Sequence, residues 1–209
     1  EATGKKPIGT RWVDILKGEI TRSRLVAQDF KRKGDNNRED LFAAMPPLEA
    51  KKALFRLAAT KMKGGRSTRP MKLMFIDVRK AHLNAKCDKE HVYVALPPES
   101  KAPPGTCGRL KRWLYGMRGA AQGWEDEFTR KLESIGFARG RSTPVVFYRE
   151  ADESRLVVHG DDFTFLGHPE SLEEIQVHMR SWWDIKLRAI VGDGAGDDKE
   201  VTILNRKLE

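Results

Sequence analysis

The stretch that decides the fold runs from Arg155 to Gly167 and reads Arg-Leu-Val-Val-His-Gly-Asp-Asp-Phe-Thr-Phe-Leu-Gly. Its two apolar runs favour β-strands, because branched and aromatic side chains pack well on a pleated sheet. Between the runs, Gly160, Asp161 and Asp162 predict a tight turn that carries two carboxylates at the tip of a hairpin. Adjacent acids of this kind are candidate metal ligands, although Asp and Gly are also ordinary turn residues.

A further acid upstream strengthens the metal interpretation. Residues 71–78 read Met-Lys-Leu-Met-Phe-Ile-Asp-Val, an apolar strand with Asp77 near its end, where an uncharged residue would suit a core strand better. Three carboxylates from two neighbouring strands can hold two Mg²⁺ ions about 3.5–4 Å apart, the arrangement that polymerases use for in-line phosphoryl displacement. We therefore expect Asp77, Asp161 and Asp162 to converge on one metal-binding point, with Mn²⁺ as a substitute ion.

Composition predicts a globular protein with a core. The chain has 209 residues, of which 39% are hydrophobic and 33% charged. It shows no membrane-length apolar stretch and no signal-peptide pattern, and it starts at Glu1 rather than Met, so we expect a soluble piece of a longer polypeptide with no membrane partner. Cys87 and Cys107 lack the spacing of a zinc site or a disulfide scaffold, which favours a reducing intracellular setting.

The charge is unevenly distributed along the chain. Residues 1–150 carry 32 Lys and Arg against 17 Asp and Glu, a net charge of +15, whereas residues 151–209 carry 7 against 13, a net charge of −6. A basic front and an acidic rear suit a nucleic-acid polymerase, which needs cations for phosphates and carboxylates for metal ions. A basic surface that serves only solubility is an equally good explanation of the charge alone.

The basic front is predicted to contain a hairpin and a helix. Residues 11–16 and 22–28 have strand character and are joined at Lys17-Gly18-Glu19. After Pro46-Pro47, apolar residues recur at helical spacing up to Met62, and Gly64-Gly65 ends the helix. We expect the other face of this helix to bind nucleic acid through Lys51, Lys52, Arg56, Lys61 and Lys63.

The remaining pattern predicts an α+β fold. A strand over residues 92–96 is followed by a helix whose buried stripe is Trp124, Phe128, Leu132 and Ile135. Ser171 and Glu174 have the spacing of a capping box for a later helix, and strands are expected over 185–190 and 201–204. Together with the 71–78 strand and the acidic hairpin, this order predicts a small antiparallel sheet backed by helices, the outline of a polymerase palm.

Several segments, in order, resemble the reverse transcriptase of copia-type long-terminal-repeat retrotransposons over the whole chain. The matching segments are Lys6-Pro7-Ile8-Gly9-Thr10-Arg11-Trp12-Val13, Arg24-Leu25-Val26-Ala27, Pro47-Leu48-Glu49-Ala50, Asp77-Val78-Arg79-Lys80-Ala81 with Leu83-Asn84, Val92-Tyr93 with Pro97-Pro98, and Leu114-Tyr115-Gly116-Met117-Arg118 with Trp124. These segments, together and in the family's order, form a specific signal.

The resemblance implies a right-hand polymerase without its thumb, acting on an RNA or DNA template-primer and deoxynucleoside triphosphates. Fingers would comprise residues 1–70 and 86–120, and the palm residues 71–85 and 121–209. The thumb, ribonuclease H and integrase regions of the polyprotein would lie outside this sequence, together with gag and protease. The setting would be a cytoplasmic virus-like particle or the nucleus.

The resemblance also implies roles for single residues. Asp77 would be the first metal ligand, Val78 would lend its backbone carbonyl, and Asp161 with Asp162 would be the paired catalytic acids. Nucleotide contacts would come from Arg22, Arg24, His82, Gly119 and Lys186. Arg22 and Arg24 would clamp the triphosphate, since guanidinium groups present several fixed donors to phosphate oxygens, and Lys186 would protonate the leaving pyrophosphate. Exposed cross-strand charges and a surface lysine explain the same three residues without any binding role.

The chain departs from the family pattern around this site. His159-Gly160 stands where the family has Tyr-Val, His82 stands where it has the Phe that blocks a ribose 2′-hydroxyl, and Gly119-Ala120-Ala121-Gln122 replaces Gln-Ala-Pro-Arg. All catalytic acids are retained. The alternatives left open are a decayed retroelement remnant that only binds nucleic acid, and a metal-dependent nuclease, which would leave the family match unexplained.

Overall fold

The computed structural model describes residues 6–30, 43–60, 70–87, 91–203 and 206–208. The chain forms two compact units, the first from residues 1–43 and 81–128 and the second from residues 44–80 and 129–209. Helices combine with antiparallel sheets in the described residues, which confirms the α+β class. None of the described helices has the length and apolar character that a membrane span needs.

The first unit contains the predicted N-terminal hairpin. Strand β1 (Thr10–Lys17) pairs antiparallel with β2 (Ile20–Ala27), and Gly18 takes a positive φ of 65° in the turn between them. A second strand pair, β4 (Tyr93–Ala95) with β5 (Cys107–Arg109), lies in the same unit with the short helices α2 (Ala81–Asn84) and η2 (Pro98–Ser100). A small core joins them, formed by Ala27, Cys87, Val92, Met117 and Ala120.

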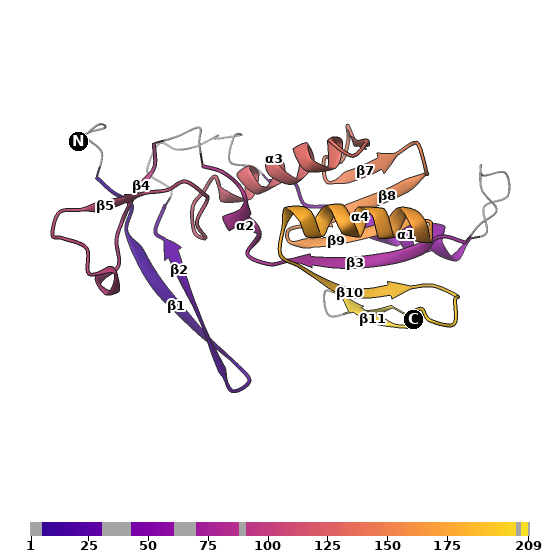
Figure 1. The fold of residues 1–209 in the computed structure, drawn as a ribbon, viewed down its shortest axis with the longest axis horizontal. Coiled ribbons are helices and arrows are strands. Elements are labelled where there is room, and N and C mark those ends of the chain that lie inside the picture. Colours follow the sequence, from indigo (N-terminus) through magenta and orange to yellow (C-terminus); the bar gives the residue numbers. More distant parts are fainter. Residues whose placement is uncertain (1–5, 31–42, 61–69, 88–90, 204–205, 209) are drawn as a thin grey trace. The chain divides into compact units, whose positions relative to one another are not determined.

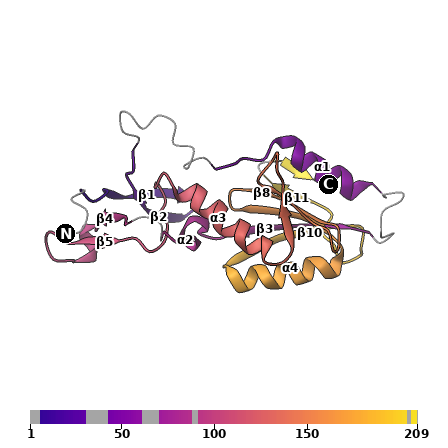
Figure 2. The ribbon, with the colours of Figure 1, turned by 90° about the horizontal axis from the view of Figure 1, so that it is seen from above.

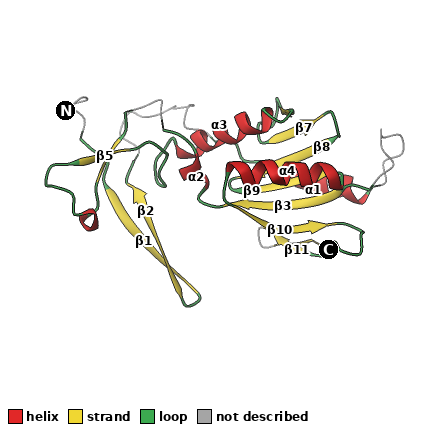
Figure 3. Cartoon of the chain, in the orientation of Figure 1, coloured by secondary structure: helices red, strands yellow, loops and turns green. Residues whose placement is uncertain are grey.

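The second unit is built on a six-stranded antiparallel sheet (Figures 1 and 3). Its strand order is β10-β3-β9-β8-β7-β6, so the predicted Asp77 strand lies at the side of the acidic hairpin. The strand bounds are β3 (Lys72–Val78), β6 (Phe137–Arg139), β7 (Val146–Arg149), β8 (Ser154–His159), β9 (Asp162–Gly167) and β10 (Ile185–Val191). A short hairpin of β11 (Val201–Ile203) and β12 (Arg206–Leu208) completes the unit.

Helices α1 (Leu48–Ala59) and α4 (Pro169–Trp182) lie on opposite faces of this sheet (Figure 2). Under α1, Leu54 packs with a cluster that includes Leu73, Phe75 and Leu166. On the α4 side, the buried residues include the helix stripe Leu172, Ile175 and Met179 and the strand residues Phe163 and Phe165. Helix α3 (Ala120–Glu133), whose last turn belongs to this unit, places Leu132 in the interior and ends before Gly136, which has a φ of 89°.

Helix α1 lies within residues 1–70, which the resemblance assigns to the fingers, and it packs on the sheet that carries the acids, because its apolar stripe matches the apolar face of β3 and β9. The division into fingers and palm stays a prediction. One expectation about the second unit needs correction. Helix α4 begins at Pro169 with His168 as its N-cap and no side-chain cap, so Ser171 and Glu174 form no capping box. Glu174 is instead engaged by Arg149 of β7, with Nη1 3.1 Å from Oε1.

Candidate active site

The turn between β8 and β9 has the predicted form. β8 ends at His159, β9 begins at Asp162, and Gly160 and Asp161 form the two-residue connection. Gly160 has a φ of 65°, as a glycine at the first central position of a type II′ hairpin turn requires. A methyl group on Gly160 would meet no atom within 4 Å, so the glycine serves the backbone conformation and not a close approach.

Strand pairing places four polar residues in one row across the sheet. Lys186 of β10 lies opposite Asp77 of β3, Asp77 lies opposite Asp162 of β9, and Asp162 lies opposite His159 of β8. Directly opposed residues of antiparallel strands point to the same face, so the row forms one polar edge above the apolar residues of that face. The Val78 N–H donates to the Asp161 carbonyl over 2.9 Å, which extends the pairing of β3 into the turn.

A cation not foreseen from the sequence joins the two acids. Arg188 Nη2 lies 2.5 Å from Asp77 Oδ2 and 3.5 Å from Asp162 Oδ1. Arg188 is the extra residue of a β-bulge, since Leu187 pairs with Ile76 and the next paired residue, Ala189, lies opposite Phe75. A β-bulge changes the direction in which a side chain points, and here it directs the Arg188 side chain to the two acids.

The pKa of Asp162 reflects its burial and the charges around it. Burial raises the pKa of Asp162, the Asp161 and Asp77 carboxylates raise it further, and the charges of Arg188 and Lys51 oppose the rise. The pKa of Arg188 is raised, mainly by its hydrogen bond to Asp77. Neighbouring carboxylates disfavour each other's ionised form, and the charge of Arg188 opposes this effect.

Lys51 lies beneath the acids and not on an exposed face. Lys51 is only 5% exposed, and its Nζ has no hydrogen-bond partner among the described residues. Burial lowers the pKa of Lys51, and the charge of Asp162 partly restores it. Burial and the charge of Lys51 also lower the pKa of His159.

The expected nucleic-acid face of α1 is therefore smaller than predicted. Lys52 and Arg56 are exposed, whereas Lys51 shares the buried stripe because it precedes Leu54 by three positions and Ala58 by seven. That spacing was present in the sequence and could have identified Lys51 as an inward residue. Lys61 and Lys63 lie outside the described residues.

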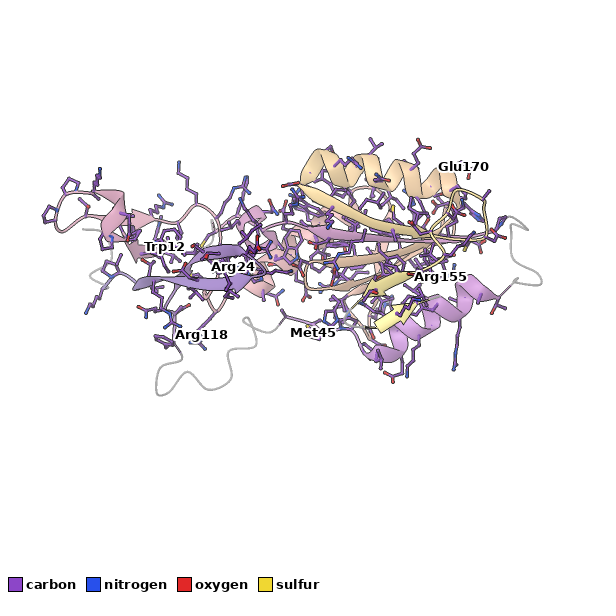
Figure 4. All side chains as sticks on the ribbon, turned by 90° about the horizontal axis from the view of Figure 1, so that it is seen from below. Trp12, Arg24, Met45, Arg118, Arg155 and Glu170 are labelled. Atoms are coloured by element: carbon purple, nitrogen blue, oxygen red, sulfur yellow. The ribbon has the colours of Figure 1, made fainter. Side chains whose placement is uncertain are left out.

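Four predicted nucleotide-binding residues belong to the first unit. Arg22 and Arg24 are exposed on β2, and Figure 4 labels Arg24. The Arg24 guanidinium carbon lies 5.7 Å from the Tyr115 ring centre. His82 also contacts Tyr115, with ring centres 5.1 Å apart. A Cβ on Gly119 would lie 2.5 Å from the Trp113 ring, so packing explains this glycine. The binding roles of all four stay predictions.

The residues present fit a divalent cation in part. Carboxylate oxygens are the ligands that Mg²⁺ prefers, and one Arg188 nitrogen lies near an oxygen of both Asp77 and Asp162, so both carboxylates face the same cation. Within the described ranges, however, no three His, Cys, Asp or Glu residues are grouped to hold a metal ion. The third ligand, Asp161, and the Val78 carbonyl stay predictions.

Residues 1–193 match the family model for reverse transcriptase (RNA-dependent DNA polymerase). The chain belongs to this reverse transcriptase family. It is 23% identical over 180 residues to the retrovirus-related Pol polyprotein from transposon TNT 1-94 of Nicotiana tabacum, and 25% identical over 175 residues to that from transposon RE1 of Arabidopsis thaliana. These alignments cover 81% and 79% of the chain but only 13% and 11% of the two polyproteins.

The match confirms that this is a reverse transcriptase domain of a retrotransposon, as the resemblance implied. Among solved structures, apo telomerase from Candida tropicalis, truncated from its C-terminal domain, aligns with a TM-score of 0.48 and 12% identity. That alignment covers 97% of this chain and 54% of the telomerase chain.

Proposed function

We propose that this reverse transcriptase domain extends a primer by two-metal nucleotidyl transfer at the end of the β3–β9 pair, with the first unit as fingers and the second as palm. One observation carries the proposal: Asp77 and Asp162, from distant parts of the chain, are paired in register and share one cationic partner. Family membership adds the reaction class. The substrates would be deoxynucleoside triphosphates and an RNA or DNA template-primer.

The acids would hold the metal ions of the reaction. Asp77 and Asp162 would provide carboxylate oxygens, with Asp161 and the Val78 carbonyl completing the set. Mg²⁺, or Mn²⁺ in its place, would lower the pKa of the primer 3′-hydroxyl and neutralise charge on the triphosphate. Strand pairing fixes both aspartates relative to each other, because the paired backbones leave only side-chain rotation free.

The bond changes are those of an in-line displacement. The primer 3′-oxygen forms a bond to the α-phosphorus and loses its proton to solvent, while the bond from that phosphorus to the pyrophosphate oxygen breaks. Lys186 lies opposite Asp77 and is exposed, so its Nζ would be placed to give a proton to the leaving pyrophosphate. Arg22 and Arg24 would hold the triphosphate, and His82 and Gly119 would border the incoming sugar.

The test is extension of a labelled DNA primer on RNA and DNA templates by this chain with Mg²⁺ or Mn²⁺. Asp77→Asn, Asp161→Asn and Asp162→Asn keep the side-chain shape and remove a ligand charge. We expect extension by the native protein and a loss of about 10³-fold or more for Asp77→Asn and Asp162→Asn, since each removes a metal ligand.

Two outcomes would contradict the proposal. Native protein that binds template-primer but never extends it would identify a remnant that only binds nucleic acid. Degradation of the labelled strand with no extension, abolished by Asp77→Asn, would identify a nuclease instead.

A further inference from the structure

Arg188 already acts as a cation on the two acids to which the proposed function assigns metal ions. Its Nη2 is 2.5 Å from Asp77 Oδ2 and 3.5 Å from Asp162 Oδ1, so the guanidinium takes the space between the two carboxylates. Mg²⁺ needs carboxylate oxygens at about 2.0–2.1 Å in near-octahedral geometry. The guanidinium and a metal ion bridging these two oxygens therefore exclude each other.

The backbone makes Arg188 a dedicated partner of the acids. It is the unpaired residue of the bulge between Leu187 and Ala189. Regular pairing of β10 with β3 would leave no unpaired residue at this position. Lys186 is the regular partner of Asp77 in the strand pairing, but Arg188 makes an ion pair with Asp77. A planar guanidinium suits this task because it can contact two carboxylates at once.

The side chain can also leave the acids without disturbing the core. Arg188 is 36% exposed and Asp77 23% exposed, so the guanidinium can turn into solvent by rotation about its own side-chain bonds. The neighbouring Ala189 is buried in the cluster under α1, which fixes the strand while Arg188 moves. Exchange of partners at the acids therefore needs no change in the sheet.

We propose that Arg188 is an exchangeable counter-cation: it holds Asp77 and Asp162 together in the metal-free protein and leaves them when a divalent ion binds. The inference rests on the proposed function, which places metal ions at these acids. Arg188 thereby sets the metal concentration at which the site fills, because each binding event must displace the guanidinium from the carboxylates. In the absence of metal it offsets the repulsion between two carboxylates that face each other.

The experiment measures Mn²⁺ affinity by electron paramagnetic resonance, without nucleotide or nucleic acid. It compares native protein with Arg188→Gln, Lys186→Gln, Asp77→Asn and the double variant Arg188→Gln/Asp77→Asn. Lys186→Gln is the matched control, since it also removes one positive charge, from the residue opposite Asp77, and leaves Arg188 in contact with the acids. We expect about tenfold tighter binding for Arg188→Gln, a much smaller increase for Lys186→Gln, and loss of the site in both Asp77 variants.

The possible failures are distinguishable. If Mn²⁺ binding depends on Asp77 but Arg188→Gln binds no more tightly than native protein or than Lys186→Gln, the exchange is wrong and the metal site stands. If no Mn²⁺ binding depends on Asp77 in any variant, both the metal site and the exchange are wrong.

A second measurement needs no variant and covers the case in which Arg188→Gln fails to fold. The native protein with ¹⁵N-labelled arginine is titrated with Mg²⁺ while the side-chain N–H resonance of Arg188 is followed. Exchange predicts that this resonance moves from a hydrogen-bonded to a solvent-exposed position as the site saturates. A resonance that stays hydrogen-bonded at saturation would overturn the inference.

Discussion

Asp77 and Asp162 lie directly opposite each other in the β3–β9 pair, and one nitrogen of Arg188 contacts both side chains. The relationship ties the strand with the single acid to the hairpin with the paired acids. It also places the candidate catalytic residues on interior strands of the sheet, since β3 and β9 each have a neighbour on both sides. The geometry of the pair is therefore set by the fold and not by a loop.

Lys51 is expected to lower the stability of the fold. A charged side chain that is 5% exposed, with no described hydrogen-bond partner at Nζ, carries a desolvation cost that an apolar residue avoids. Lys51→Met should raise the free energy of unfolding at pH 7 by about 1–2 kcal/mol in urea denaturation. Lys52→Met, at the exposed neighbouring position, should change it by less than about 0.5 kcal/mol. A loss of stability in Lys51→Met would show that the charge is well compensated.

Lys51 should also make the free energy of unfolding depend on pH. The pKa of Lys51 is lowered in the folded state, so above that lowered value and up to about 10.4 the unfolded chain binds more protons than the folded one. The free energy of unfolding of the native protein should therefore increase through this residue as the pH rises across that window. Urea denaturation between pH 7 and 10 should show the increase in native protein and a smaller one in Lys51→Met; equal slopes would contradict it.

Arg149 is expected to be the main ionic contributor to the stability of the second unit. It is buried on β7, its Nη2 lies 2.5 Å from Asp152 Oδ2, and it also engages Glu174 of α4. Arg149→Met should cost about 2–3 kcal/mol in chemical denaturation, because it leaves Asp152 half-buried without its partner. The matched change Arg155→Met, on the neighbouring strand and against the Tyr148 ring, should cost less than about 1 kcal/mol.

Acid should weaken the Arg149 cluster. Burial alone would raise the pKa of Asp152, but hydrogen bonds from Arg149, Ser171 and Ser154 hold it well below its ordinary value. A depressed carboxyl pKa stabilises the fold above about pH 4, and this contribution is lost as the pH falls further. Asp152→Asn should therefore flatten the loss of stability between pH 4 and pH 2 in thermal unfolding. If Asp152→Asn loses as much stability between pH 4 and pH 2 as the native protein does, Asp152 does not cause the loss.

Template-primer binding should depend on the exposed cations of α1. Lys52→Gln/Arg56→Gln should weaken binding and reduce the slope of log affinity against log salt by about 1 for each phosphate that is no longer neutralised. Arg180→Gln, an exposed arginine on α4 on the opposite face of the sheet, is the control for net charge. If both substitutions alter the slope equally, nucleic acid is not bound at α1.

Sugar discrimination should respond to the side chain at position 82. An imidazole is smaller and more polar than the phenyl ring of the family, so it leaves room for a ribose 2′-hydroxyl. Preference for deoxynucleotides should increase by about tenfold in His82→Phe and decrease in His82→Ala, measured as the ratio of incorporation efficiencies. Unchanged ratios would mean that His82 serves its ring contact with Tyr115 and not the sugar.

Sequence patterns predicted the local elements well, because the information is local. Val157, Val158, Phe163 and Phe165 are fully or almost fully buried strand residues, and Gly160 takes the positive φ that its turn needs. The expectation that the Asp77 strand and the acidic hairpin belong to one sheet also followed from these patterns. Sequence could not supply the register, which depends on how the apolar faces of β3 and β9 match.

Two of the three features that were missed depend on tertiary packing. Arg188 appeared to be one position of a regular strand, and only the bulge in β10 directs it to the acids. Glu174 fitted a capping box, but the buried guanidinium of Arg149 is a stronger partner for a carboxylate than a helix terminus. Lys51 looked like one of five exposed cations, although its spacing from Leu54 and Ala58 already indicated the buried side of α1.

The most direct test of the central claim is an anomalous-scattering map of crystals soaked in Mn²⁺. The account predicts a metal peak bound by carboxylate oxygens of both Asp77 and Asp162, with the Arg188 guanidinium turned away from them, and no such peak in Asp77→Asn crystals. A map with no peak between these two side chains at saturating Mn²⁺, or with its metal bound elsewhere and Arg188 still on Asp77, would contradict it.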